Sequence, residues 1–294
     1  MLKGYIVSKQ NNKRKILYDI CIKVKNFIED NSIQLGESII LIISIMVPFF
    51  LDIKGMFEQY LKDNYLTPDN VVQYLLIIRG KYAVAIGIFV IALIAIRKHN
   101  KEIIMNKRNV YHDYSFEWYC YCAKILGIDK CSLVLVPIFM QFKLVIQNVF
   151  NEFPLDETSY PVQDNEIGIK VSKVNWNLEY LEINLILEDT YPIFLSQIPS
   201  IKKNLPTLII SRNDGKNVSR HFSQQYIDRI INEVRQLKNG VIVNIYATTN
   251  PMNTLNISKR VFTNASRGNV ASLYVFQQEN TNERLFKSKG KKIY

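Results

Sequence analysis

Residues 82–96 have the sequence Tyr82-Ala-Val-Ala-Ile-Gly-Ile-Phe-Val-Ile-Ala-Leu-Ile-Ala-Ile96, an apolar run that stops at Arg97 and Lys98. Together with the apolar residues 71–78, the run is long enough to cross the hydrocarbon core of a bilayer as a helix. A basic pair directly after such a run is typical of a helix that ends on the cytoplasmic side. We therefore predict a transmembrane helix over about residues 71–96.

A second apolar run precedes the first, with the sequence Ile39-Ile-Leu-Ile-Ile-Ser-Ile-Met-Val-Pro-Phe-Phe-Leu51. It predicts a crossing over about residues 38–53, so residues 37–98 form a two-helix membrane region. The alternative is a buried helix of a soluble core, because such a helix is also apolar on every side.

The charges predict how these helices are oriented. The chain carries a formal net charge of +11, and residues 1–36 hold seven Lys or Arg against three Asp or Glu. Residues 52–70, between the two runs, hold two basic against four acidic side chains. Because positive charge collects on the cytoplasmic side, we expect the N-terminus and the large C-terminal domain to be cytoplasmic and residues 52–70 to be outside.

The first 36 residues form a cytoplasmic amphipathic segment. Apolar side chains recur there at helical spacing, with lysines between them: Ile16, Leu17, Ile20, Val24, Phe27 and Ile28. Such a helix can lie on the inner leaflet with its lysines near anionic headgroups. Packing against the cytoplasmic domain explains the same pattern.

From Leu181 onward, strand-like and helix-like segments alternate, which is the signature of a parallel sheet with crossover helices. We predict a Rossmann-like mixed α/β domain over residues 105–280. The predicted strands are 183–187, 207–210, 241–246 and 271–276, and the predicted helices are 112–126, 223–238 and 255–261. Residues 133–180 leave strand and helix equally defensible, and we expect the polar chain after Gln277, including the basic tail 281–294, to be disordered.

Polar residues follow three of these predicted strands, and the carboxyl ends of parallel strands meet at one edge where ligands usually bind. Hydroxyls, amides and Arg guanidinium groups suit a phosphorylated, nucleotide-like ligand. Helix caps and loop ends use the same residue types, so a purely structural role is the alternative. The candidate ligand-binding residues are Asp189, Tyr191, Ser211, Arg212, Asn213, Arg220, Thr248, Thr249 and Asn250.

The sequence offers little sign of catalysis or of a metal centre. It contains no P-loop, no dinucleotide glycine fingerprint and no nucleophile elbow, which favours a protein that is not an enzyme without excluding one. Cys120, Cys122 and Cys131 match no zinc spacing, so we expect neither a metal nor a cofactor. These cysteines and Cys21 fall on the predicted cytoplasmic side, where thiols stay reduced.

A basic N-terminal helix, crossings at 38–53 and 71–96 and a cytosolic α/β domain together resemble the two-transmembrane effectors of bacterial anti-phage (abortive infection) systems. The stretches Asp189-Thr-Tyr-Pro-Ile193 and Ala247-Thr-Thr-Asn-Pro251 look like loop motifs of the domain. The resemblance implies a multi-pass protein of the bacterial inner membrane that disrupts the membrane after sensing a trigger. It implies three kinds of partner: the lipid bilayer, further copies of the chain, and either a nucleotide messenger or a reverse transcriptase and nucleic-acid complex.

Two other functions fit the same sequence. One is a membrane-tethered enzyme that processes nucleotides, with Asp189, Arg212 or His221 in its site. The other is a passive membrane scaffold, in which the polar strand ends are only loop chemistry.

Overall fold

The structure is a computed structural model that describes residues 18, 20–50, 71–162, 168–177, 179–212, 220–263, 268–279 and 283–294. The segment 52–70, most of the N-terminal segment before residue 20, and the candidate residue Asn213 lie outside the described residues. The chain divides into two compact units. One comprises Met1–Ile103 and Glu117–Asp129, and the other comprises Ile104–Phe116 and Lys130–Tyr294.

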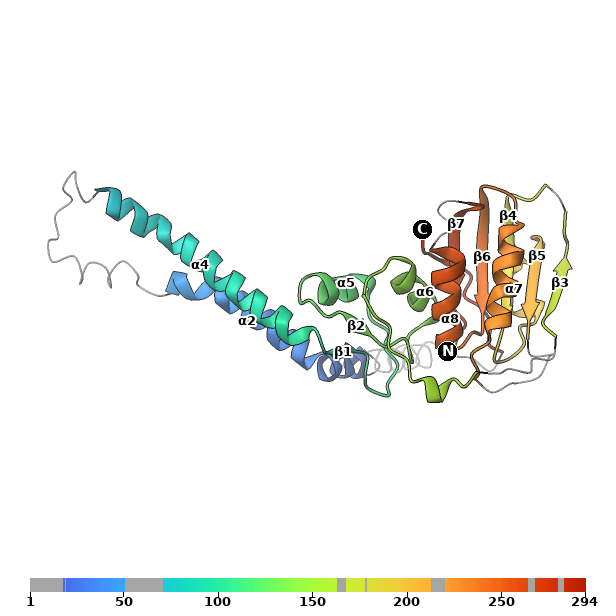
Figure 1. Cartoon of the computed structure of the whole chain (residues 1–294), viewed down its shortest axis with the longest axis horizontal. Helices are drawn as coiled ribbons and strands as arrows, with labels where there is room; N and C mark the ends of the chain where they lie inside the picture. The colour runs from blue at the N-terminus through green and yellow to red at the C-terminus, as the bar shows by residue number, and fades with distance from the viewer. Residues whose placement is uncertain are drawn as a thin grey trace, which may run out of the picture. The chain divides into compact units, whose positions relative to one another are not determined.

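The first unit contains two long helices that pack side by side, α2 (Ser32–Phe50) and α4 (Val71–Asn100) (Figure 1). The segments Ser32–Phe50 and Tyr82–Asn100 are each long and apolar enough to cross a membrane. Large apolar side chains stay exposed on both helices, for example Ile42 at 61% and Ile91 at 69%. Exposure of this kind suits contact with lipid rather than a place inside a soluble core.

A short helix of the same unit, α5 (Phe116–Lys124), is hydrogen-bonded to the residues around the start of α2. Trp118 Nε1 donates to Asn31 Oδ1 at 2.9 Å, and the Tyr121 hydroxyl donates to Ser38 Oγ at 2.8 Å. The helix starts at Phe116 rather than at the expected residue 112. His112 instead lies buried in a loop of the other unit, where Nε2 is 3.0 Å from the Arg108 carbonyl.

The end of α4 is fixed by one amide. Asn100 Nδ2 donates to Glu37 Oε2 of α2 at 2.8 Å and to the carbonyl of Leu126 at 2.9 Å.

Gly127 has φ +75°, and a Cβ atom there would lie 3.2 Å from the Arg97 Cα atom. Only glycine combines this φ with so close an approach, so Gly127 turns the chain three residues after the end of α5.

The second unit is built on a six-stranded sheet in the order β3-β5-β4-β6-β7-β8 (Figure 1). The four central strands β5, β4, β6 and β7 are parallel, and the edge strands β3 and β8 are antiparallel to their neighbours. The bounds are β3 Lys170–Val174, β4 Glu182–Glu188, β5 Thr207–Ser211, β6 Val241–Ala247, β7 Val270–Phe276 and β8 Lys291–Lys292. A separate parallel pair is formed by β1 (Ile104–Met105) and β2 (Lys130–Cys131).

Three helices cover one face of this sheet: α6 (Ile138–Ile146), α7 (Gln224–Arg235) and α8 (Pro251–Ile257), which continues as a π-helical turn over Ser258–Phe262. Alternate strand residues such as Leu185 and Ile245 join their core. On the opposite face, Ile186 and Tyr246 pack with Ile193, Ile198 and Phe286. The 3-10 helices η2 (Leu195–Gln197) and η3 (Ser200–Lys202) lie in the same segment, on either side of Ile198. A third 3-10 turn, η1, spans Glu157–Ser159.

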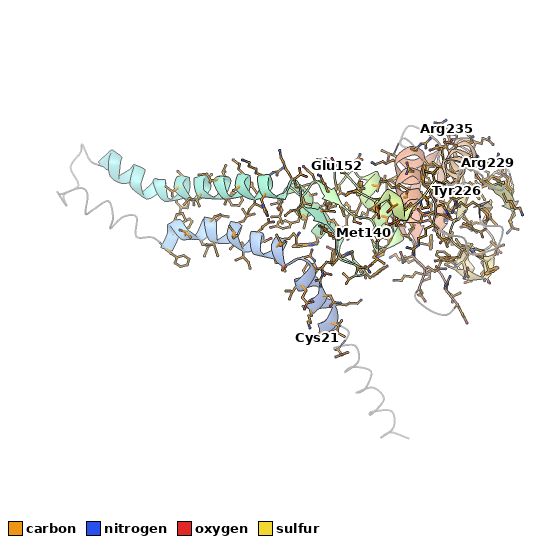
Figure 2. All side chains as sticks on the ribbon, turned by 60° about the horizontal axis from the view of Figure 1, so that its bottom comes forward. Cys21, Met140, Glu152, Tyr226, Arg229 and Arg235 are labelled. Carbon is orange, nitrogen blue, oxygen red and sulfur yellow. The ribbon has the colours of Figure 1, made fainter. Side chains whose placement is uncertain are left out.

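The predicted strands and the helix after Ser223 are present. Ser223 Oγ accepts from the Tyr226 backbone N–H at 3.1 Å, and Gly240 follows the helix with φ +80°. Tyr226 is fully buried on α7, whereas Arg235 of the same helix is exposed (Figure 2). The next helix begins at Pro251 rather than near residue 255.

The end of the chain differs from the expectation of a disordered tail. Lys291 and Lys292 form β8 against β7, and Ile293 is only 3% exposed. The Ile293 carbonyl accepts from Gln147 Nε2 at 2.9 Å. A single isoleucine after two lysines is a weak sequence signal, but packing against the sheet buries it.

Candidate functional site

The parallel strands β5, β4 and β6 are neighbours in the sheet, so the residues that follow their carboxyl ends lie together. Asp189 follows β4, Arg212 follows β5, and Thr248 follows β6. The structure thus brings together the loops that the sequence singled out, and their contacts decide which side chains remain open to a ligand.

Asp189 is the centre of this edge and is fully buried. Its Oδ1 accepts from Arg212 Nε at 2.5 Å, and its Oδ2 accepts from Asn250 N at 2.9 Å, Asn250 Nδ2 at 3.0 Å and Asn253 Nδ2 at 2.9 Å. Burial raises the pKa of the Asp189 carboxyl, and the guanidinium and amide donors oppose that rise. We call Asp189, Arg212, Asn250 and Asn253 the Asp189 cluster.

The cluster also fixes the approach to α7. Asn250 Nδ2 and Asn253 Nδ2 both donate to the His221 carbonyl, at 2.8 and 3.0 Å. Asn253 Oδ1 accepts from the Ser223 backbone N–H at 3.2 Å. Asn250 further caps α8 by accepting from the Asn253 backbone N–H at 2.9 Å. Each of these polar groups is therefore used inside the fold.

Thr248 joins the ends of β4 and β6. Its hydroxyl accepts from the Asp189 backbone N–H at 3.2 Å and donates to the Tyr191 carbonyl at 2.8 Å. The Thr190 hydroxyl donates in turn to the Thr248 carbonyl at 2.7 Å. The Thr249 hydroxyl lies 2.7 Å from that of Thr254.

Two further candidates of the sequence analysis are also engaged within the protein. Arg212 is 3% exposed on its side chain and is paired with Asp189, and Ser211 is the last residue of β5 and is 9% exposed. Arg212 is placed to neutralise a buried carboxylate. It does not line the cavity described next.

A cavity of about 310 Å³, here called the edge cavity, opens beside the Asp189 cluster. Four of the sequence candidates besides Asn250 line it: Tyr191, Arg220, Thr248 and Thr249. Its other wall was missed by the sequence analysis, because residues 133–150 could not be assigned there. The lining comprises Tyr111, residues 134–138, Gln141, Thr190, Tyr191, Arg220, residues 247–251, Gln277 and Gln278.

The edge cavity combines an apolar wall with a polar floor. Val134, Val136 and Ile138 supply apolar surface, while threonine hydroxyls and the amides of Gln277 and Gln278 supply polar groups. Among the residues that the structure describes, Arg220 is the only charged side chain that lines it, and no described carboxylate does. Arg220 is exposed and forms no ion pair with any residue that the structure describes. The cavity therefore favours a ligand with an anionic group and an apolar or aromatic part.

The chain contains two apolar helices of membrane-spanning length and an α/β unit with a cavity at the carboxyl edge of its sheet. These features are typical of a membrane-associated protein with an α/β domain. The family follows from a match over residues 19–294 to SUa-2TM, described as the SMODS- and Ubiquitin system-associated 2TM effector domain. The chain belongs to this family. The match confirms the resemblance to two-transmembrane effectors of anti-phage systems.

Solved structures offer a weaker likeness. The chain is similar to the Acinetobacter baumannii Cap4 SAVED/CARF-domain containing receptor with the cyclic trinucleotide 2'3'3'-cAAA, at 8% identity and a TM-score of 0.42 over 80% of this chain and 64% of that one. The same receptor with 3'3'3'-cAAA gives 9% identity and a TM-score of 0.41, over 78% of this chain and 63% of that one. The chain thus spans less than two thirds of the receptor's length. No curated protein matches the chain.

The Asp189 cluster predicts a large cost for Asp189→Asn. The amide would keep one acceptor but would place its NH₂ group against the donors of Asn250 and Asn253, and Arg212 would stay buried without a counter-charge. Breaking a buried pair costs about 3–5 kcal/mol, which lowers the melting temperature by roughly 6 °C or more. Thermal unfolding of the detergent-solubilised chain measures this.

The matched control is Asp228→Asn, which removes a partner of Arg260 from an ion pair whose two side chains are 50% and 40% exposed. An exposed pair contributes about 0–1 kcal/mol. Equal melting temperatures for the two variants would show that the Asp189 cluster does not hold the edge together.

Proposed function

We propose that this protein is a membrane effector of bacterial anti-phage defence whose α/β unit binds a nucleotide in the edge cavity and whose paired helices then disrupt the inner membrane. The observation that supports nucleotide binding is the edge cavity, in which Arg220 is the only charged residue among the described lining residues. In open α/β sheets, including Rossmann-like domains, ligands bind beyond the carboxyl ends of the strands. The position of the edge cavity agrees with that rule.

A nucleotide fits the edge cavity in size and in chemistry. Ligand pockets span roughly 300–1,000 Å³, and the volume of about 310 Å³ lies at the lower end of that range. An Arg guanidinium matches phosphate oxygens, and an apolar wall beside Tyr111 and Tyr191 suits a planar base. Burial raises the pKa of Tyr191, so its phenol stays protonated at neutral pH.

Ligand binding is tested on the full chain in detergent. Its melting temperature is measured against mononucleotides, cyclic nucleotides, cyclic oligonucleotides and short single-stranded DNA, because a ligand of the folded state must stabilise it by mass action. At a ligand concentration of 100 times Kd the gain is about 2.7 kcal/mol. We expect a rise with at least one nucleotide that Arg220→Ala abolishes.

The matched control is Arg235→Ala, which removes an exposed arginine of α7 that lies outside the cavity lining. It should leave the rise intact. Unchanged melting with every nucleotide would refute a nucleotide sensor and leave a protein-triggered effector or a scaffold.

The proposed topology puts both the N-terminus and the α/β unit in the cytoplasm. Residues 20–30 are helical, and Ile20, Val24 and Ile28 are exposed at a spacing of four, which supports a helix lying on the inner leaflet. The acidic segment 52–70 is then outside.

Cysteine labelling tests this orientation. A membrane-impermeant maleimide should label Lys62→Cys in intact spheroplasts, because residue 62 lies between the two crossings. The native, exposed Cys21 should react only after lysis. Labelling of Cys21 before lysis would reverse the proposed orientation.

Polar side chains between the helices support a role beyond anchoring. The buried face of α2 carries Gln34, Glu37 and Ser44 among apolar residues, and Glu37 accepts from Asn100 of α4. Polar groups inside membrane segments mark functional pathways by default. Two helices alone enclose no channel, so we propose that several copies of the chain assemble and turn these groups toward a water-filled path.

Reconstituted vesicles test membrane disruption. The full chain is placed in phosphatidylethanolamine and phosphatidylglycerol vesicles that hold a potassium diffusion potential, and the nucleotide that raised the melting temperature is added. We expect a voltage-sensitive dye to report loss of the potential with the native chain and with Arg235→Ala, but not with Arg220→Ala. Binding without any loss of potential would favour a tethered enzyme or a scaffold.

The enzyme hypothesis gains little from the site. Asp189 is fully buried, is paired with Arg212 and does not line the edge cavity, so it is not placed to act there as a base. Chromatography of the nucleotide after incubation with the chain would reveal turnover. The partnership with a reverse transcriptase and nucleic acid stays a prediction of the sequence resemblance.

A further inference from the structure

The two apolar helices hold a single acidic side chain in their membrane-spanning segments. Within Ser32–Phe50 and Tyr82–Asn100 that residue is Glu37. It lies on the buried face of α2 and is 7% exposed. A carboxylate that is removed from water is tolerated only when a counter-charge and hydrogen-bond donors compensate for the lost hydration. A place between two helices that contact lipid makes this requirement stricter.

The contacts of Glu37 supply a donor but no positive charge. Asn100 Nδ2 of α4 donates to Glu37 Oε2 at 2.8 Å. Among the residues that the structure describes, no Lys or Arg forms an ion pair with Glu37. Arg97 and Lys98 of α4 are exposed, and Arg97 Nη1 donates to the Lys124 carbonyl. The negative charge of Glu37 is therefore not balanced by a described basic side chain.

Two buried amide oxygens beside this carboxylate have no hydrogen-bond donor. One is Gln34 Oε1, on the buried face of α2 and one helical turn before Glu37, and residues at this spacing are neighbours. The other is Asn100 Oδ1, which belongs to the amide that binds Glu37. Gln34 is 6% exposed, and Asn100 is fully buried. Buried polar atoms without a partner are rare in native proteins, so these two oxygens indicate a missing electropositive partner.

The neighbouring titratable groups leave one net negative charge here. Cys122 of α5 is fully buried, and burial together with the negative charge of Glu37 raises the pKa of its thiol to about 12. The thiol is thus neutral at physiological pH and does not offer a thiolate to a soft metal. His99 of α4 also interacts electrostatically with Glu37, but it is exposed and its charge is screened by solvent. Oxygen acceptors with one negative charge are the ligands that a hard cation prefers.

We propose that Glu37, Gln34 and Asn100 bind a monovalent metal cation, Na⁺ or K⁺, between α2 and α4. The carboxylate balances the charge of the ion, and the two amide oxygens are its neutral ligands. A divalent ion would leave a net positive charge beside lipid, so a monovalent ion fits better. Because the ligands come from both helices, the bound cation holds α2 against α4. The site lies wholly within the helical unit and does not depend on the proposed nucleotide binding.

Thermal unfolding of the full chain in detergent tests the site. The melting temperature is compared in the chlorides of sodium, potassium and N-methyl-D-glucamine at equal ionic strength, because the organic cation is too large for a site between two packed helices. A ligand of the folded state stabilises it by mass action, so we expect sodium or potassium to raise the melting temperature by about 2–4 °C. Titration of the effective salt gives its half-saturating concentration.

Two variants locate the bound cation. Glu37→Gln removes the charge but keeps the shape of the side chain, and it should abolish the difference between the salts. Gln34→Leu removes one amide oxygen and should raise the half-saturating concentration about ten-fold, an effect typical of weakened metal sites. The matched control is Glu29→Gln, which removes an exposed carboxylate that pairs with Lys25 and should preserve both the difference and the concentration.

A protonated Glu37 without a bound cation is the rival explanation. It predicts equal melting temperatures in all three salts and no effect of Glu37→Gln, and this result would overturn the cation site. Equal stabilisation of Glu37→Gln and the native chain by sodium or potassium would overturn it too, because the ion would then bind elsewhere. A cooperative unfolding transition verifies that each variant folds, and the Gln34→Leu titration decides if Glu37→Gln does not. Nucleotide binding at Arg220 is measured separately, so either proposal can fail alone.

Discussion

The architecture of the α/β unit depends on one buried carboxylate. Asp189 is cut off from water at the end of β4, and a carboxylate in such a place is tolerated only with a counter-charge and a full set of donors. Arg212 supplies the charge, and Asn250 and Asn253 supply the amide donors. Since these residues follow three neighbouring strands or open α8, satisfying one charge fixes the geometry of the whole strand edge.

The hydrogen bonds around Asp189 distinguish the polar side chains that hold the fold together from those that could bind a ligand. The side chains that donate to Asp189 already form hydrogen bonds within the fold, and so does Thr248, which joins β4 to β6. They are therefore poorly placed to form strong hydrogen bonds to a ligand. Arg220 is different, because it lines the edge cavity and pairs with no described carboxylate. An arginine beside an apolar wall is the arrangement on which the proposed anion site rests.

The helical unit is organised by a comparable polar contact. Asn100 binds Glu37 and the Leu126 carbonyl at once, and Arg97 Nη1 binds the Lys124 carbonyl at 2.8 Å. The segment Glu117–Asp129, with most of α5, thus belongs to the membrane helices, although the residues before and after it belong to the α/β unit. The backbone therefore passes between the two units three times.

The sequence by itself determined the two apolar helices and the alternation of strands and helices after Leu181. These are periodic, local signals whose strength does not depend on distant residues, and Ser223 and Gly240 delimit α7 by short-range capping chemistry. It also determined that the polar strand ends lie together, because parallel strands require this. Only the tertiary structure decided which of those side chains form contacts within the protein. Arg212, which the sequence analysis proposed as a phosphate ligand, is paired with Asp189. It also decided that residues 134–138 and Gln141 line the edge cavity and that Ile293 is buried, since burial is set by long-range packing that no local pattern encodes.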